Sequence, residues 1–474
     1  MHLTDSKTKV REVLSRAWHG ASKLWLRPAR LLILAAVFHL ALTLTIYGLG
    51  RRAVFPGTFD GNGIGVSFAL DGAQHRADAA HLSEILARGE FHAWLTIPYP
   101  FHVKLYSISF ALFGPLLGYT IVGAEPLNAA YYLAILVLVF NLGRELFNQR
   151  TGLIAAAAVA LWPSLLLHTT QFLKEPLFLA GTLAFILILL RYLTRSHSWR
   201  GALLTGAAGG LIAAVLWLAR DNMSGIVVAI LVLAAVLFVI RQFVARRVQI
   251  TNLAGIVLLI AITICAQQVL PRISLAGPAA ASARMMATRR QSPPASDMEA
   301  AARATSVEAP SSAPWSRAAA SVWRARRKFI NRYPNAGSNI DRNVQLLSAG
   351  DVLLYLPRAA AIGFFAPFPN MWVTAGKEVG SGGRLLAGLE TFVIYCVYCL
   401  ALYGLWRARR RLPVWFLFSV AVIGMIALGF VVINIGALFR LRYVFWILLI
   451  ILGAEGAGFV LERFSKKQEP EAPA

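Results

Sequence analysis

The chain has 474 residues, of which 58 % are hydrophobic and only 14 % are charged. Soluble globular domains carry about 25 % charged residues, so this composition predicts an integral membrane protein and excludes disordered, collagen-like and small disulfide-bonded classes. The formal net charge is +24. Its arginines lie in short clusters between apolar stretches, which is typical of membrane topology and argues against a nucleic-acid partner.

Apolar runs long enough to cross a bilayer, about 20 residues each, recur along the chain. They lie at 31–49, 105–123, 129–146, 151–167, 176–193, 202–219, 225–244, 251–270, 386–406, 414–434 and 438–461, with a weaker run near 352–369. The predicted regions are a cytoplasmic basic N-terminus (1–30), a transmembrane module (31–270) that includes an outer loop (50–104), an extracytoplasmic loop with an interfacial segment (271–385), C-terminal transmembrane helices (386–461) and a cytoplasmic tail (462–474).

Clusters of basic residues set the orientation, because cytoplasmic loops carry the excess of Lys and Arg. Such clusters precede the first apolar run and recur around Arg195, Arg246 and Arg409. Five crossings would place the Arg195 cluster outside, so one early segment, either 105–123 or 129–146, does not cross. About ten crossings result, with both termini inside, two large loops outside and the 352–369 segment on the outer side.

The first outer loop carries a carboxylate in a position suited to chemistry. Asp71 begins a short amphipathic helix that ends at Gly89. An acid at a helix start stabilises the helix as an N-cap, and it can equally take a proton from an incoming hydroxyl. Both interpretations of Asp71 stay open at this point.

A second carboxylate, Glu175, lies beside Lys174 at an apolar boundary, where Pro176 suits the first turn of the next helix. A Lys–Glu pair there either anchors the helix at the membrane interface or takes part in a site. Because the predicted topology keeps most Lys and Arg residues on the cytoplasmic side, basic residues on the outer face are candidates for a functional site. They are Lys104, which lies near His102, and Arg220, Arg440 and Arg442.

The histidines have no metal-ligand spacing, so no metal site is predicted, and the question of a divalent cation stays open. Within the second loop, Gln291 to Ser316 has the composition of a flexible segment, whereas Trp323 to Leu347 mixes aromatic, basic and amide residues like a folded region.

The order of several motifs resembles the GT-C glycosyltransferases, which include protein O-mannosyltransferases and lipid A aminoarabinose transferases. An acid follows the first helix, an alanine-rich helix ends in Gly, and further motifs follow over residues 31 to 240. They are Pro98-Tyr99-Pro100-Phe101-His102, Gly143-Arg144-Glu145-Leu146-Phe147, Leu161-Trp162-Pro163-Ser164 and Gln171-Phe172-Leu173-Lys174-Glu175-Pro176-Leu177.

The resemblance implies an all-α, GT-C-like bundle and a polyprenyl-phosphate sugar donor, with Asp71 at the position of the catalytic base and Glu175 at that of a second acid. Gly72 departs from the acidic pair of many relatives. A set of substrate-binding residues is then expected to neutralise the leaving phosphate. They are Lys104, His102, Lys174, Arg220, Arg440 and Arg442.

The sequence therefore predicts a multi-pass glycosyltransferase of the inner (plasma) membrane, acting on an extracytoplasmic acceptor that is a glycolipid, a polysaccharide or a protein. The alternatives are a flippase or transporter for lipid-linked oligosaccharides, and a polysaccharide polymerase or ligase that uses a lipid diphosphate. A transporter is expected to carry charged residues inside its spans, and the predicted spans are almost free of them.

Overall fold

The structure, a computed structural model, describes residues 28–66, 70–220, 223–273, 314–332, 336–373 and 380–466. The predicted all-α class is confirmed, because these residues form helices with only two isolated β-bridges. The helices are α2 (Pro28–Arg51), α3 (Leu70–Ala87), α4 (Phe91–Thr96), α5 (Phe101–Leu117), α6 (Ile121–Leu146), α7 (Gln149–Ala160), α8 (Pro163–Thr169), α9 (Glu175–Thr194), α10 (Trp199–Ala219), α11 (Ser224–Ala245), α12 (Ile250–Ile273), α15 (Pro314–Arg332), α16 (Ala349–Phe365), the 3₁₀ turn η2 (Pro369–Met371), α17 (Gly380–Ala408), α18 (Leu412–Val431), α19 (Ile435–Leu441) and α20 (Tyr443–Lys466).

In the described part of the chain, nine helices are long and apolar enough to cross a membrane: α2, α6, α9, α10, α11, α12, α17, α18 and α20. The pair α7 and α8 passes the same test as one span bent by 69° and raises the number to ten. Pro163 opens α8, and its missing N–H explains why the helix breaks there. The chain is a multi-pass membrane protein, in agreement with the predicted number of crossings.

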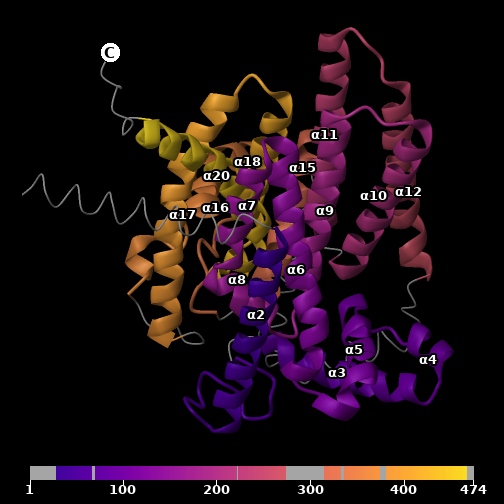
Figure 1. Cartoon of the computed structure of the whole chain (residues 1–474), viewed down its shortest axis with the longest axis vertical. Helices are drawn as coiled ribbons and strands as arrows, with labels where there is room; N and C mark the ends of the chain where they lie inside the picture. The colour runs from indigo at the N-terminus through magenta and orange to yellow at the C-terminus, as the bar shows by residue number, and fades with distance from the viewer. Residues whose placement is uncertain are drawn as a thin grey trace, which may run out of the picture.

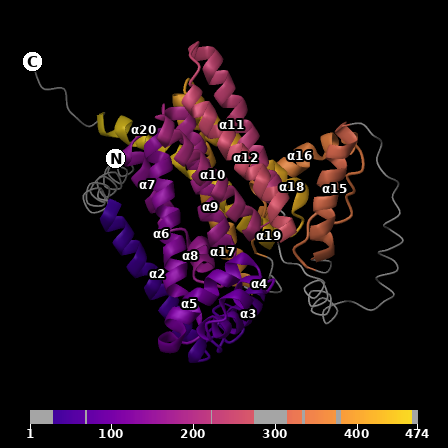
Figure 2. The same cartoon turned by 90° about the vertical axis from the view of Figure 1, so that its right-hand side faces the viewer.

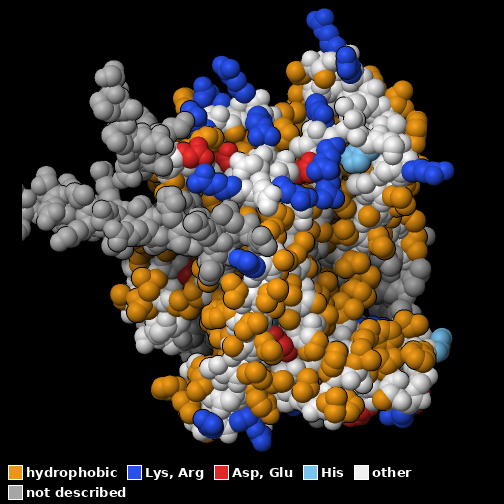
Figure 3. Space-filling model, viewed as in Figure 1, with side chains coloured by type: hydrophobic (Ala, Val, Ile, Leu, Met, Phe, Trp, Pro, Cys, Tyr) orange, Lys and Arg blue, Asp and Glu red, His pale blue; other side chains and the backbone are white. Residues whose placement is uncertain are grey.

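The long helices run side by side, and the two ends of this helical bundle differ from each other (Figures 1 and 2). We call one the loop end, because α3, α4 and α5 lie there below the bundle in Figure 1. The other, the arginine end, gathers most of the visible Lys and Arg side chains above a broad apolar band (Figure 3). Arg241 and Arg409 line one cavity there, and Arg195 lies on Glu145 at the same end.

The helix α5, the counterpart of 105–123, is shorter than the helices counted as membrane spans. It has 17 residues and contains Pro115, and it packs on α3 at the loop end. The next helix, α6, has 26 residues and runs the full length of the bundle. Between the predicted alternatives 105–123 and 129–146, length and composition favour α6 as the crossing helix.

Small residues let the helices of the C-terminal part approach closely. Gly404 of α17 and Gly456 of α20 face each other's backbones, and a Cβ on either would collide with a backbone carbonyl of Leu452 or Leu400. These positions are therefore closed to larger residues.

Several spanning helices contain carboxylates, among them Glu125, Glu390 and Glu455, which differs from the expectation of nearly charge-free spans. Two of them are buried. Glu125 of α6 accepts hydrogen bonds from Thr43 and from His39, at 2.7 and 2.8 Å. Glu390 of α17 accepts hydrogen bonds from Ser164 and Trp162. Each is 5 % exposed and fully hydrogen-bonded, which is how a polar group is accommodated at this depth.

The loop end has its own apolar core, which fixes the approach to α9. Tyr106 and Phe110 of α5 and Leu82 of α3 pack with Phe172. The Tyr106 hydroxyl lies 3.1 Å from the carbonyl of Gln171 and 3.2 Å from that of Leu173. These contacts hold the segment before Glu175 in place.

Part of the second predicted loop is folded onto the bundle. Arg326 of α15 is buried and donates hydrogen bonds to the carbonyls of Phe430 and Asp341, both at 2.7 Å. The predicted folded region from Trp323 to Leu347 corresponds to α15 and the segment after it, apart from 333–335. Most of the predicted flexible segment and most of both termini lie outside the described residues; the last three residues of that segment, 314–316, begin α15.

Candidate functional site

Glu175 is the centre of a charged cluster at the loop end. It opens α9, with Lys174 at the N-cap position, and its carboxylate is 11 % exposed. Its Oε1 accepts a hydrogen bond from Arg220 Nη2 at 2.8 Å, and Arg440 Nη1 lies 3.9 Å away. We call Lys174, Glu175, Arg220 and Arg440 the Glu175 cluster.

The Glu175 cluster joins three parts of the chain that are far apart in sequence. Arg220 is the C-cap residue of α10, and Arg440 lies in the last turn of α19. Counted over the four residues, three positive charges face one negative charge, so the cluster has a surplus of two positive charges. Glu175 Oε2 is buried and has no hydrogen-bond partner among the described residues. The cluster can therefore hold an anion and also offers a carboxylate oxygen to a hydroxyl group.

Two histidines of the loop helices lie close to this cluster. His75 Nδ1 is 2.8 Å from the carbonyl of Phe172, and His102 Nε2 is 3.3 Å from His75 Nε2. Because a carbonyl only accepts, His75 carries its proton on Nδ1, and His102 must donate from Nε2. His102 Nδ1 is then a bare, buried acceptor without a partner in the described part of the chain.

Burial keeps both imidazoles neutral. It lowers the pKa of His75, and it lowers the pKa of His102 to about 2, with the neighbouring His75 and Lys174 adding to the effect. Neutral imidazoles can exchange hydrogen bonds with a hydroxyl without adding charge to the site.

Asp71 lies in the first turn of α3, one helical turn before His75. It is half-buried, and His75 is within electrostatic range of Asp71, Lys174 and Glu175. Both carboxylates singled out in the sequence therefore lie within electrostatic range of one imidazole. Their roles in chemistry stay a prediction.

Arg442 does not join Arg440, although the sequence analysis grouped the two. It is completely buried, donates to the carbonyl of Gly363 at 3.0 Å and stacks over the Trp446 ring, 4.4 Å from its centroid. Its Nε and Nη2 have no hydrogen-bond partner among the described residues. Arg442 thus faces α16, whereas Arg440 faces Glu175.

Lys104 is also placed elsewhere. Its Nζ donates to the carbonyl of Leu95 at 2.6 Å and lies 5.6 Å from the centre of the Trp94 ring. These contacts fasten α5 to α4, and no contact of Lys104 with the Glu175 cluster is seen.

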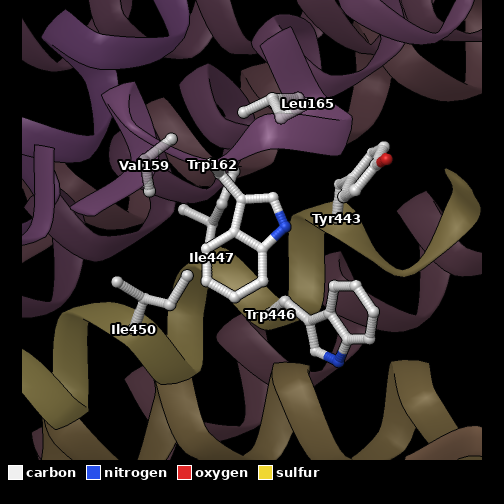
Figure 4. A pocket seen from close by; sticks show the side chains of 7 residues that line it. All are labelled: Val159, Trp162, Leu165, Tyr443, Trp446, Ile447 and Ile450. Carbon is white, nitrogen blue, oxygen red and sulfur yellow. The ribbon is translucent and has the colours of Figure 1, made fainter. Parts of the chain in front are cut away.

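A polar chain that the sequence analysis did not assign lies next to the cluster. Ser164 donates to Glu390 at 2.5 Å, and its carbonyl lies 2.5 Å from His168 Nδ1, which is 3.1 Å from the Tyr443 hydroxyl. Tyr443 also lines a narrow apolar crevice with the indoles of Trp162 and Trp446 (Figure 4). Because Ser164 and Tyr443 are 279 positions apart, no local motif reveals that they belong to one polar chain.

No group of three or more metal-ligating side chains is assembled within the described ranges.

Comparison with known proteins gives the fold. No family model matches the chain, and no curated protein sequence matches it. Among solved structures, the chain is similar to the archaeal oligosaccharyltransferase AglB from Archaeoglobus fulgidus, in complex with an inhibitory peptide and a dolichol-phosphate, with a TM-score of 0.52 and 15 % identity. AglB is a glycosyltransferase of the GT-C superfamily. The chain has a GT-C fold.

The likeness covers 96 % of this chain and 53 % of AglB, so the chain spans about half the length of that structure. The chain is also similar to ArnT from Cupriavidus metallidurans, bound to undecaprenyl phosphate, with a TM-score of 0.36 and 16 % identity over 92 % of this chain and 81 % of ArnT. So low a TM-score carries no argument. The GT-C fold predicted from the motifs is confirmed, whereas activity must be argued from the site.

Proposed function

We propose that the chain is a membrane glycosyltransferase that moves a sugar from a polyprenyl-phosphate donor to an acceptor hydroxyl at the loop end. The Glu175 cluster carries this proposal, because it gathers a surplus of positive charge around a largely buried carboxylate, with Asp71 also within electrostatic range of the neighbouring His75. AglB, which shares the fold, was solved with a dolichol-phosphate. A lipid phosphate is the anion that best suits a cationic cluster at a membrane boundary.

In the proposed reaction, the acceptor oxygen attacks the anomeric carbon and the bond from that carbon to the phosphate oxygen breaks. The electron pair stays on the phosphate, whose charge rises from about −1 to −2 during the step. Arg220, Arg440 and Lys174 stabilise this developing charge. Attack from the opposite face inverts the anomeric carbon.

Asp71 is the proposed base that takes the acceptor proton. A carboxylate already held by two arginines, as Glu175 is, accepts a proton poorly, which favours Asp71 for this role. Glu175 keeps the two arginines in position, and its Oε2 can accept a hydrogen bond from a sugar or acceptor hydroxyl. His75, within electrostatic range of both acids, helps to orient that hydroxyl.

The arginine end faces the cytoplasm in this proposal, by the positive-inside rule, and the loop end faces the extracytoplasmic space. The membrane is then a bacterial inner membrane. The sugar is a hexose or a pentose, and the acceptor is a glycolipid, a polysaccharide or a protein.

The proposal is tested with membranes that contain the protein and radiolabelled lipid donors. A polyprenyl-monophosphate sugar should lose its sugar to an acceptor, whereas a polyprenyl-diphosphate sugar should not. Transfer from the diphosphate alone would identify a polymerase or ligase. Radiolabelled lipid that crosses the membrane intact would identify a flippase. A flippase is the second candidate because Glu125 and Glu390 are buried carboxylates within spanning helices.

A further inference from the structure

A second site with a basic lining lies at the arginine end, away from the Glu175 cluster. It is a cavity of about 340 Å³ between the C-terminal turn of α11 and the turn that joins α17 to α18. Arg241, Arg409 and Arg410 line it together with Ile240, Val244, Ala245, Leu412 and Trp415. Its size is within the range of small-molecule sites.

The three arginines have no acidic partner there. The cavity lining contains no carboxylate, and none of the three forms an ion pair with a described residue. Arg241 donates to the carbonyl of Tyr192 at 3.0 Å and Arg409 to that of Trp406 at 2.8 Å, which leaves other guanidinium N–H groups for a ligand. Uncompensated guanidinium groups gathered on one cavity favour a phosphate, which they can bind in a bidentate way.

The rest of the lining is apolar and partly exposed. Val244 is 81 % exposed and Ile240 43 %, and both lie near Arg241 on α11. Trp415 closes the other side, where its Nε1 donates to the carbonyl of Arg409 at 2.7 Å. A free phosphate would use the cations and leave this apolar wall in contact with water, whereas a phospholipid uses both.

The depth also fits a headgroup, since α11 ends at Ala245 and α18 begins at Leu412. The ends of spanning helices lie at the level of the lipid phosphates. Topology explains why arginines occur at this end, but not why three of them from two elements line one cavity.

We propose that this cavity binds the headgroup of an anionic phospholipid, with its phosphate on Arg241, Arg409 and Arg410 and its acyl chains along Ile240 and Val244. The site is separate from the proposed transfer reaction and does not depend on it. It fastens α11 to the α17–α18 turn.

Native mass spectrometry of the full-length protein in detergent tests the proposal, with phosphatidylglycerol as the probe. The wild-type protein should retain phosphatidylglycerol at least about tenfold better than phosphatidylcholine, and an equal concentration of inorganic phosphate should not displace it. Equal retention of both lipids, or displacement by phosphate, would overturn the proposal, the latter in favour of a small-anion site.

A charge-matched pair of variants locates the site. Arg241→Gln/Arg409→Gln/Arg410→Gln should lose the preference for phosphatidylglycerol. Arg30→Gln/Arg200→Gln/Arg247→Gln removes the same charge from exposed positions at the same end and should keep it. Equal loss in both variants would show a general surface-charge effect and contradict the proposal. If the triple variant does not fold, Arg410→Gln alone, at an exposed position, should still weaken retention several-fold.

Discussion

At the scale of single residues, the ion pair between Glu175 and Arg220 is the feature on which the site depends. Neither side chain is more than 12 % exposed. Removing Arg220 takes away the closest counter-ion of Glu175, while Arg440 and Lys174 offset part of the loss, so we expect a cost of about 1 to 3 kcal/mol. Removing both charges leaves hydrogen-bonding groups of similar shape.

We therefore expect Arg220→Gln to lower the melting temperature of the detergent-solubilised protein by several degrees, and Glu175→Gln/Arg220→Gln to recover most of that loss. The double-mutant cycle in thermal stability measures the coupling. Additive effects of the two single changes would show that the pair is not formed.

The variant Asp71→Asn distinguishes two roles of Asp71, that of a catalytic base and that of a residue that only stabilises the start of its helix. Asp71 lies in the first turn of α3, where its charge stabilises the helix by up to about 1 kcal/mol, so a purely structural role would leave stability and transfer within about 1 kcal/mol of wild type. A base cannot be replaced by an amide, and we expect transfer to fall on the order of 100-fold or more at normal expression.

Asp78→Asn is the matched control for Asp71→Asn, because Asp78 lies on the same helix and accepts a hydrogen bond from Gln74. Asp60 is unsuitable, since its carboxylate holds the backbone N–H of Asn62 in a turn. A dead Asp78→Asn with an active Asp71→Asn would move the base to another acid of the same helix.

The buried imidazoles predict an acid-sensitive loop end. The pKa of His102 falls from 6.5 to about 2 on folding, and that of His75 is also lowered. Below pH 6.5 the unfolded chain therefore binds protons that the folded protein does not, so this contribution is fully present above that pH and is lost as the pH falls towards the folded values. The melting temperature should fall between pH 7.5 and 5.

His102→Gln keeps a hydrogen-bond donor and should flatten this pH dependence, whereas His92→Gln, at an exposed position, should not. An unchanged slope in His102→Gln would show that another group titrates.

The sequence reveals the acids and the cations of the site but not their pairing. Glu175 and Lys174 are adjacent and mark a helix start, which is local information. The partners of Glu175 lie 45 and 265 positions away, at Arg220 and Arg440, and only the packing of α9, α10 and α19 brings them together. The separation of Arg442 from Arg440 depends in the same way on where α20 begins.

At the scale of the helices, hydropathy predicts most spans, because about 20 apolar residues have few other uses. Hydropathy alone does not decide whether a segment crosses when its apolar run is close to the minimum length for a span. α5 is apolar but short, and only its packing on α3 shows that it stays at the loop end. The break at Pro163 and the inclusion of Glu125 within α6 follow from contacts that hydropathy does not contain.

Cysteine labelling tests the path of α5. In a cysteine-free background, Glu90→Cys and Tyr119→Cys flank α5, and both are exposed. An impermeant thiol reagent should label both from the same side, opposite to Arg200→Cys. Labelling of positions 90 and 119 from opposite sides would make α5 a full crossing and reverse the orientation of every later helix.

At the scale of the whole molecule, the GT-C fold places a cationic cluster at the end of the bundle that carries the loop helices, and leaves the arginine end to set the orientation. The central claim is that the Glu175 cluster binds the donor phosphate. This binding can be measured without the transfer reaction, because the product, a polyprenyl phosphate, carries the same phosphate group as the donor.

Binding of the donor phosphate is measured most directly by the dissociation constant of a polyprenyl phosphate for the purified protein. Glu175→Gln/Arg220→Gln/Arg440→Gln removes one net positive charge from the cluster without leaving a lone buried carboxylate, and Arg324→Gln removes one from the exposed face of α15. Loss of two charged hydrogen bonds should weaken binding about 100-fold or more in the triple variant, with Arg324→Gln unchanged. Binding by the folded triple variant as tight as by the wild type would contradict the claim.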